Sequence, residues 1–456
     1  MTTFDLSHDA GLLLYALMGV VGLIILISRF KVNSFVALIM ASLFVGCCSG
    51  MPLADIGKAF QDGVGAVLGS IAVVIGLGTI LGKMLAESGG AGCIAAVLIR
   101  TMGEKRIHWA MMIIAFLIGI PVFFAVGLVL LIPILFTMAR ATRMPLLHLG
   151  IPLLAGLSVA HGLLPPHPGP MAAIGVFNNL AGKVDVGRII LYSLLIGFPT
   201  AIIAGPVFGT FLARRVRVEL GGVGEQLTRE SARTNSPGFL PALFTILLPV
   251  LLMLLPTLAD VALARQNPWR TGMDFAGHPV VAMLVSVLFA FYSFGFTCGF
   301  SREQILKFSN DCLGPVAIVL LVVGAGGGFS KVLDQSGVGQ AVAGLAAGVA
   351  VSPLLLGWLI AALIRVATGS ATVAITMAAG IIAPIAAARQ GTNLELLLVA
   401  MGAGSLILSH VNDGGFWLVK EYFNLTVAQT LKTWTVMETI ISVTALLLVL
   451  LLDFML

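Results

Sequence analysis

VIGLGTILGKMLAESGG, at residues 74–90, recurs in a related form as VVGAGGGFSKVLDQSGV at residues 322–338. The alignment of the two stretches matches several residue pairs: Gly76 with Gly324, Gly78 with Gly326, Lys83 with Lys331, and Ser88-Gly89 with Ser336-Gly337. His161 and His410 stand at almost the same offset, near the end of each half. Two related halves, each with glycine-broken hydrophobic segments that carry polar residues, are typical of secondary transporters.

The composition is that of a polytopic membrane protein. Of 456 residues, 59% are hydrophobic and 10% are charged, and the mean hydropathy is +1.08. Long apolar stretches run through the whole chain, which predicts an all-α membrane protein with about 10–14 transmembrane segments. The net charge of +5 lies in short loops and one connector, so we expect no nucleic-acid partner.

The lengths of the apolar segments predict irregular helices. The stretches at about 109–139 and 353–387 are too long for one straight span, whereas several others hold nearer 10 than 20 residues. Short pieces indicate re-entrant hairpins, and long ones indicate broken or paired helices.

One sizeable polar connector, residues 214–238, separates membrane repeats at 1–213 and 239–456. It holds five arginines: Arg214, Arg215, Arg217, Arg229 and Arg233. The positive-inside rule places the connector in the cytoplasm and, from the basic loop around Arg29, directs the first span inward. We therefore expect two inverted-topology repeats with both termini on the periplasmic side. The acidic N-terminal tail before a full-length apolar run is not typical of a cleavable signal.

The sequence HGLLPPHPGP at residues 161–170 interrupts the first half. Its prolines cannot continue a helix because proline lacks the amide donor. Unwound backbone at membrane depth is tolerated where it is buried in protein or lines a wet cavity, so His161 is a candidate substrate contact and proton carrier. His161 and His167 share no helical face and have no third ligand nearby, so we expect no metal site. The alternative is a loop at the membrane edge.

The counterpart in the second half is SHVNDGGFW at residues 409–417. An aspartate close to membrane depth is costly unless it is paired, protonated or facing a cavity. We therefore predict Asn412 as a substrate contact and Asp413 or His410 as proton carriers. The alternative is an interfacial turn in which Asp413 caps the next helix.

A third constellation, RVATGSATVA at residues 365–374, places a lone arginine inside an apolar stretch. Arg365 either snorkels at a helix end or pairs with an anion, and a guanidinium can grip a carboxylate through two parallel hydrogen bonds. The residues that follow are small or hydroxylated and are predicted to contact the substrate: Thr368, Gly369, Ser370 and Thr372.

The repeated motif itself suggests turns after two hairpins, where Ser88 and Ser336 would contact the substrate. Its glycines would let backbone approach a ligand, or would equally serve close helix packing. Lys83 with Glu87 and Lys331 with Asp334 are spaced as helix-end ion pairs.

Signatures of enzymes are missing from the sequence. It holds no P-loop, no HExxH and no GxSxG in a credible context, and its five cysteines show no metal-ligand spacing. We therefore predict a protein that is not an enzyme and needs no cofactor.

Four stretches resemble the gluconate permease (GntP) family of gluconate:proton symporters: VIGLGTILGKMLAESGG, HGLLPPHPGP, GSATVA and SHVNDGGFWLVKEYFNLT. The resemblance extends over essentially the whole chain. It implies proton-driven uptake of sugar acids across the bacterial inner membrane. The chain also resembles the wider ion-transporter superfamily, which implies inverted repeats, two re-entrant hairpins, an elevator-type motion and a homodimer.

Ala125 departs from the family pattern. Members commonly carry an acidic residue at this position, in Tyr-Glu-Val-Gly or a similar form, where this chain reads Phe124-Ala125-Val126-Gly127. If that carboxylate binds a substrate hydroxyl or carries the proton, this chain lacks it.

We therefore predict an importer of gluconate or a related aldonate, coupled to protons. Arg365 would hold the carboxylate, while Ser370, Thr372, His161 and Asn412 would contact hydroxyls. The alternatives are a carrier of D-serine or another hydroxy acid, a sodium-coupled carrier, a channel or sensor, and, most remotely, a membrane-embedded metalloenzyme.

Overall fold

A computed structural model of the chain describes residues 6–216, 236–264, 267–314, 316–338, 341, 352–389 and 391–456. These residues are folded into helices and connecting loops, without a strand. Nine helices within the described residues are long and apolar enough to cross a membrane, or ten if one pair bent by 50° counts as one span. The all-α membrane fold is confirmed, and the nine or ten candidate spans of the described residues lie just below or at the lower limit of the predicted 10–14.

The helices of the first predicted repeat have these bounds: α1 (Leu6–Ser28), α2 (Ser34–Cys48), α3 (Leu53–Ser88), α4 (Gly90–Met102), α5 (Ile107–Gly119), α6 (Phe124–Thr142), α7 (Leu146–Leu163), α8 (Pro168–Leu180), α9 (Val186–Ile202) and α10 (Phe208–Ala213). Those of the second are α12 (Phe239–Met253), α13 (Leu255–Ala262), α14 (Trp269–Gly277), α15 (Pro279–Ala290), α16 (Arg302–Asp311), α17 (Val316–Gln335), α19 (Pro353–Thr368), α20 (Ala371–Ala388), α21 (Leu394–Gly404), α22 (Gly414–Tyr422), α23 (Val427–Thr430) and α24 (Val436–Met455). Short 3₁₀ and π segments join several of them.

The long apolar stretches are broken, as predicted. The stretch 109–139 divides between α5 and α6, and the stretch 353–387 divides between α19 and α20. The proline-rich motif separates α7 from α8, and the second-half motif separates α21 from α22. Each break leaves helix ends inside the protein, where polar side chains must satisfy them.

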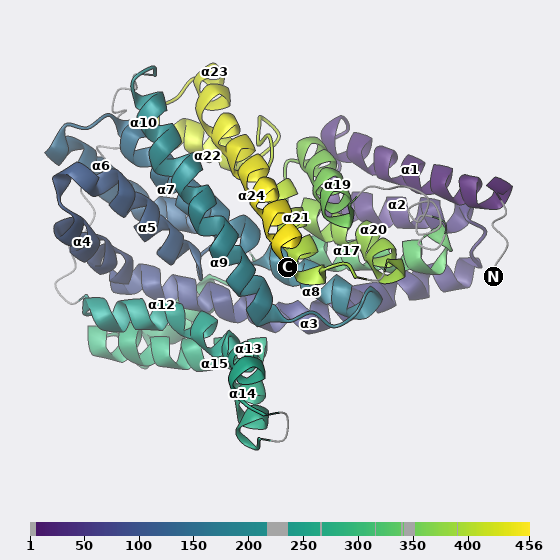
Figure 1. Cartoon of the computed structure of the whole chain (residues 1–456), viewed down its shortest axis with the longest axis horizontal. Helices are drawn as coiled ribbons and strands as arrows, with labels where there is room; N and C mark the ends of the chain where they lie inside the picture. The colour runs from purple at the N-terminus through teal and green to yellow at the C-terminus, as the bar shows by residue number, and fades with distance from the viewer. Residues whose placement is uncertain are drawn as a thin grey trace.

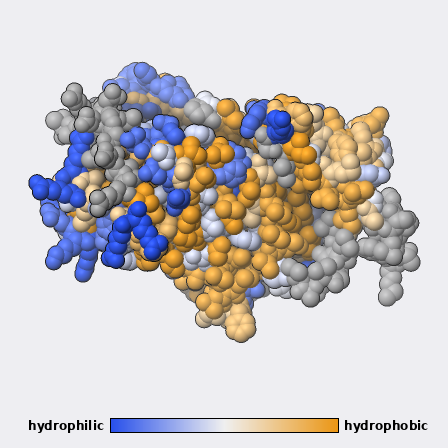
Figure 2. Space-filling model, turned by 90° about the horizontal axis from the view of Figure 1, so that it is seen from above, coloured by the Kyte–Doolittle hydropathy of each residue, from blue (hydrophilic) through white to orange (hydrophobic). Residues whose placement is uncertain are grey.

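The outer surface suits a lipid environment. Large exposed apolar side chains lie on helices at the perimeter, among them Leu17, Leu195, Leu288 and Leu447. Figure 2 shows apolar residues spread over much of one face of the molecule, with hydrophilic residues gathered toward one end. A soluble monomer rarely exposes so much contiguous apolar surface.

Helices from the two predicted repeats interlock. The 36-residue helix α3 runs along much of the long axis of the molecule (Figure 1) and packs against α17 of the other repeat. At the crossing, a Cβ atom on Gly327 would stand 2.7 Å from the Gly63 carbonyl oxygen. Gly63 and Gly327 therefore allow the backbones of α3 and α17 to pack closely at this crossing.

The charged residues of the repeated motif pair within their own helices. Lys83 pairs with Glu87 at 2.7 Å and Lys331 with Asp334 at 2.9 Å, which confirms both predicted ion pairs.

Most of the polar connector lies outside the described part of the chain, namely residues 217–235, which include Arg217, Arg229 and Arg233. The inverted relation of the repeats and the orientation of the termini stay predictions.

The crossing of α3 and α17 can be tested by adding one methyl group. Gly327→Ala should destabilise the protein by about 1–3 kcal/mol, because the backbones cannot separate without losing their contact. Gly92→Ala, on α4 and with no heavy atom within 4 Å of the added Cβ, is the matched control. Thermal unfolding in detergent measures both, and equal melting temperatures would contradict the packing role.

Candidate substrate-binding cavity

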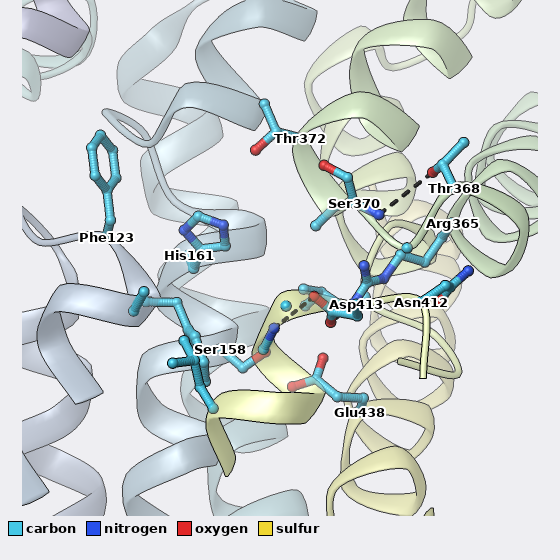
Figure 3. A pocket seen from close by; sticks show the side chains of 18 of the residues that line it. Phe123, Ser158, His161, Arg365, Thr368, Ser370, Thr372, Asn412, Asp413 and Glu438 are labelled. Atoms are coloured by element: carbon cyan, nitrogen blue, oxygen red, sulfur yellow. Dashed lines mark hydrogen bonds and ion pairs between the residues drawn. The ribbon is translucent and has the colours of Figure 1, made fainter. Parts of the chain in front are cut away.

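Four helix breaks meet at one cavity of about 510 Å³. Each break contributes loop residues and the adjoining helix ends to the lining: Phe123, Phe124 and Ala125 at the α5–α6 break; His161 and Pro168 at the α7–α8 break; Arg365, Thr368, Gly369, Ser370, Ala371 and Thr372 at the α19–α20 break; and Asn412, Asp413, Gly414 and Gly415 at the start of α22. Ser158 of α7, Trp434 and Glu438 complete the polar part of the wall. Figure 3 shows most of these side chains directed into the same space.

The cavity is surrounded by the N-terminal ends of four helices. α6, α8, α20 and α22 all begin at residues that line it. The first amides of a helix have no partner within the helix, and the helix dipole adds a partial positive charge at this end. The convergence favours a bound anion, although the prolines at the start of α8 remove some of its donors.

Arg365 and Asp413 form the charged centre of the cavity. Arg365 Nη2 lies 2.5 Å from Asp413 Oδ2, and the two side chains are only 4% and 15% exposed. Arg365 is therefore buried and paired rather than snorkelling. Its Nε has no hydrogen-bond partner among the described residues, so the guanidinium retains a donor beside the cavity.

Asp413 has a structural role as well. Its carboxylate accepts a hydrogen bond from the Gly415 amide at 2.9 Å, which caps the N-terminus of α22. The Ser409 hydroxyl also donates to it. Asp413 therefore both caps α22 and lines the cavity.

The motif SHVNDGGFW, at residues 409–417, packs against the turn between α19 and α20 and stabilises it. Gly369 adopts a φ of +73°, and a Cβ atom there would stand 2.6 Å from the carbonyl carbon of Asn412. Asn412 Nδ2 in turn donates to the Val366 carbonyl at 2.8 Å, which satisfies a free carbonyl at the end of α19. Only glycine fits position 369 without strain.

The hydroxyl groups of Ser370 and Thr372 face the side of the cavity on which His161 lies (Figure 3). Ser370 also caps α20, because its Oγ accepts a hydrogen bond from the Val373 amide at 3.4 Å. Thr368 lines the wall, but its hydroxyl donates back to the Ile364 carbonyl. Of these three hydroxyls, that of Thr372 is the most available to a ligand.

The two histidines of the proline-rich motif differ in environment. His161 lines the cavity, and its Nδ1 has no partner among the described residues. His167 is buried, and its Nε2 donates to the Gly119 carbonyl at 2.5 Å, since a carbonyl can only accept. The ring centroids stand 5.0 Å apart, so His167 supports His161 by packing against it.

Three predicted site residues lie outside the cavity wall. His410 bonds the Val366 carbonyl through Nε2 at 2.9 Å and supports the helix break instead. Ser88 and Ser336 donate to the Leu85 and Leu333 carbonyls, each within its own helix end. The two serines have equivalent local roles, as their positions in the repeat suggest, but they do not line this cavity.

The sequence interpretation missed Glu438, Ser158 and Trp434. Glu438 is an acid near the start of the apolar segment 433–454, and an ionisable residue in such a segment marks a functional site by default. The sequence alone therefore gave a reason to include Glu438 among the candidate site residues. Ser158 and Trp434 carry no distinctive motif, and only the fold brings them to the cavity.

A second cavity of about 410 Å³ adjoins the first and shares Phe123 and Val319 with it. It is lined by the end of α3, the α5–α6 break and the start of α17, with Lys83 among its residues. The two side chains of Phe123 and Val319 therefore separate the polar cavity from a more apolar one.

The fold and the cavity define a polytopic membrane protein with a buried, anion-favouring site at paired helix breaks. A family model described as "GntP family permease" matches residues 11–455. The chain belongs to the GntP permease family and is therefore a membrane transporter rather than an enzyme.

Named relatives cover nearly the whole chain. The chain is 52% identical to a gluconate permease of Pseudomonas aeruginosa over 99% of its length and 100% of that protein. It is 41% identical to an L-idonate transporter of Escherichia coli, over 94% of this chain and 96% of the relative. A D-serine transporter of the same organism is 37% identical, with 94% and 95% covered.

Two solved transporters share the fold at low identity. MtrF of Neisseria gonorrhoeae superposes with a TM-score of 0.68 at 15% identity, covering 93% of this chain and 96% of that one. The YdaH transporter of Alcanivorax borkumensis superposes with a TM-score of 0.62 at 18% identity, covering 92% and 97%. These likenesses show the architecture alone.

The Arg365–Asp413 ion pair predicts that a substitution of Asp413 partly restores the stability that a substitution of Arg365 removes. Arg365→Met should lower the free energy of unfolding by about 3–5 kcal/mol, because it leaves the Asp413 carboxylate, only 15% exposed, without its counter-charge. Arg365→Met combined with Asp413→Asn should recover at least about half of that loss, since asparagine keeps the cap of α22 without the charge. Denaturant unfolding of these two variants and of Asp413→Asn alone measures the losses, and a loss in the double variant equal to the sum of the two single losses would contradict the pairing.

Proposed function

We propose that this protein imports gluconate or a closely related aldonate across the bacterial inner membrane by proton symport. The single observation that carries the proposal is the buried Arg365 beside four converging helix N-termini, because this arrangement suits one carboxylate. The named relatives support the substrate class, since they include gluconate and L-idonate transporters.

The roles of the lining residues follow from their chemistry. Arg365 binds the carboxylate through the donor that Asp413 leaves free. Thr372, Ser370, Asn412 and His161 lie within the same wall and contact the hydroxyl groups of a polyol chain. The Oδ1 atom of Asn412 is buried and lacks a partner among the described residues, so it needs a donor such as a substrate hydroxyl.

Transport requires that this site face each side of the membrane in turn. We propose an elevator-type motion, in which the elements that carry the four breaks move against the remaining helices.

The proposed arrangement in the membrane is a homodimer in which the connector of each chain lies in the cytoplasm and both termini lie in the periplasm. Cysteine labelling at Arg215 and at Asp453, from each side of the membrane, tests the topology: we expect opposite sidedness.

The function is tested by uptake of labelled gluconate into proteoliposomes. An inward proton gradient should raise accumulation at least about 10-fold over a collapsed gradient, because the gradient supplies the driving force. Unlabelled gluconate, idonate, fructuronate, D-serine and glycerate compete in parallel. Strong competition by D-serine alone would indicate that the substrate is a hydroxy amino acid. Uptake that depends on sodium at fixed pH would indicate that sodium, rather than the proton, is the coupling ion.

Substrate contacts are tested by removing one hydroxyl. Thr372→Val should raise the gluconate KM by about 5–20-fold. The variant loses one hydrogen bond of about 1–1.5 kcal/mol and leaves a substrate hydroxyl without a partner. The control is Thr439→Val on α24, whose hydroxyl donates to the Thr435 carbonyl and whose side chain lies outside the cavity wall. An unchanged KM in Thr372→Val would remove this residue from the site.

A further inference from the structure

Glu438 is a buried acid in the wall of the substrate cavity. It lies in the first turn of α24 and is 1% exposed. Among the described residues, its Oε1 has no hydrogen-bond partner. Such a carboxyl group costs folding free energy unless it is neutral or meets a ligand, so its presence needs a reason.

The groups around Glu438 come from three elements. Ser158 of α7, Arg365 of α19 and Asp413 at the start of α22 line the cavity together with Glu438, and the charges of Arg365 and Asp413 act on its carboxyl group. His161 of α7 lines the same cavity. The helices α9 and α21, which also pack against α24, contribute no charged residue to the described lining. Figure 3 shows the Glu438 carboxyl group below Asp413, on the same side as Ser158.

The charge balance of the cavity distinguishes Glu438 from Asp413. Arg365 is already paired with Asp413 at 2.5 Å, and Asp413 also caps α22. An ionised Glu438 would make the lining net negative before any anion enters. Coulomb repulsion between two carboxylates in a site of effective dielectric near 20 lowers affinity by about 10–100-fold. A neutral Glu438 removes this repulsion, so binding of the anion and protonation of Glu438 favour each other.

We propose that Glu438 carries the proton that is transported with the substrate. This inference rests on the proposed proton symport. One proton from the outside forms an O–H bond on the Glu438 carboxylate as the sugar-acid anion binds Arg365. On the inside the O–H bond breaks, the proton leaves to water and the anion dissociates. One proton and one monovalent anion cross together, so the cycle is electroneutral and leaves Glu438 ionised again.

Gluconate-driven acidification of proteoliposomes tests this assignment. External gluconate should acidify the lumen of vesicles with wild-type protein, read by an internal pH dye. Glu438→Gln, which mimics the protonated carboxyl group, should reduce this acidification at least about 10-fold. The same variant should keep gluconate exchange between the two sides within about 3-fold of wild type, because exchange needs no deprotonation. Asp453→Asn, an exposed acid on the same helix, is the control and should match wild type in both assays.

The outcomes separate the inference from the function on which it rests. Gluconate uptake without acidification by the wild type would overturn proton symport and the assignment together. Acidification by Glu438→Gln equal to the wild type would overturn the assignment alone. If Glu438→Gln lacks exchange because it does not fold, Glu438→Asp decides. Its shorter side chain should keep acidification but shift the pH of half-maximal uptake by about 0.5 or more, and an unshifted profile would overturn the assignment.

Discussion

The buried ion pair between Arg365 and Asp413 is the interaction on which the rest of the site depends. Removing two charges from water costs several kcal/mol each, and replacing such a pair by apolar residues often stabilises a protein. The pair is therefore a poor device for stability. In the proposed function the pair has another use, because it keeps a guanidinium charged and oriented inside the protein for an anionic substrate.

The broken helices follow from the same requirement. A cavity at membrane depth can hold backbone donors only where helices end, and such ends must be satisfied by the protein itself. Asp413 and Ser370 cap α22 and α20, while Asn412 and His410 bond the carbonyl of Val366 at the end of α19. The second-half motif therefore supports the break and also contributes to the wall. In the first half, His167 bonds the Gly119 carbonyl and supports the end of α5 in a similar way.

Much of the fold could be predicted from the sequence because membrane helices have a strong signal. Apolar length, proline positions and the repeated glycine motif predicted the all-α architecture and the breaks in 109–139 and 353–387. The cavity was predicted in part, since Arg365, Thr372, His161, Asn412 and Asp413 all line it. Ser88, Ser336 and His410 have polar side chains near helix ends, but local backbone carbonyls take their hydrogen bonds. Sequence cannot tell a hydroxyl that bonds its own helix from one that faces a ligand, because both occur at the same kind of break.

The central claim is that the cavity recognises a carboxylate attached to a polyol chain. Calorimetric titration of the purified protein with gluconate and with sorbitol, which keeps the hydroxyl groups but lacks the carboxylate, tests it most directly. Our account predicts that gluconate binds at least about 100-fold more tightly than sorbitol, since a charged hydrogen-bonded pair and four helix ends contribute about 3 kcal/mol or more. It also predicts that Arg365→Met abolishes most of this difference. Equal affinities of the wild-type protein for the two ligands would contradict the account.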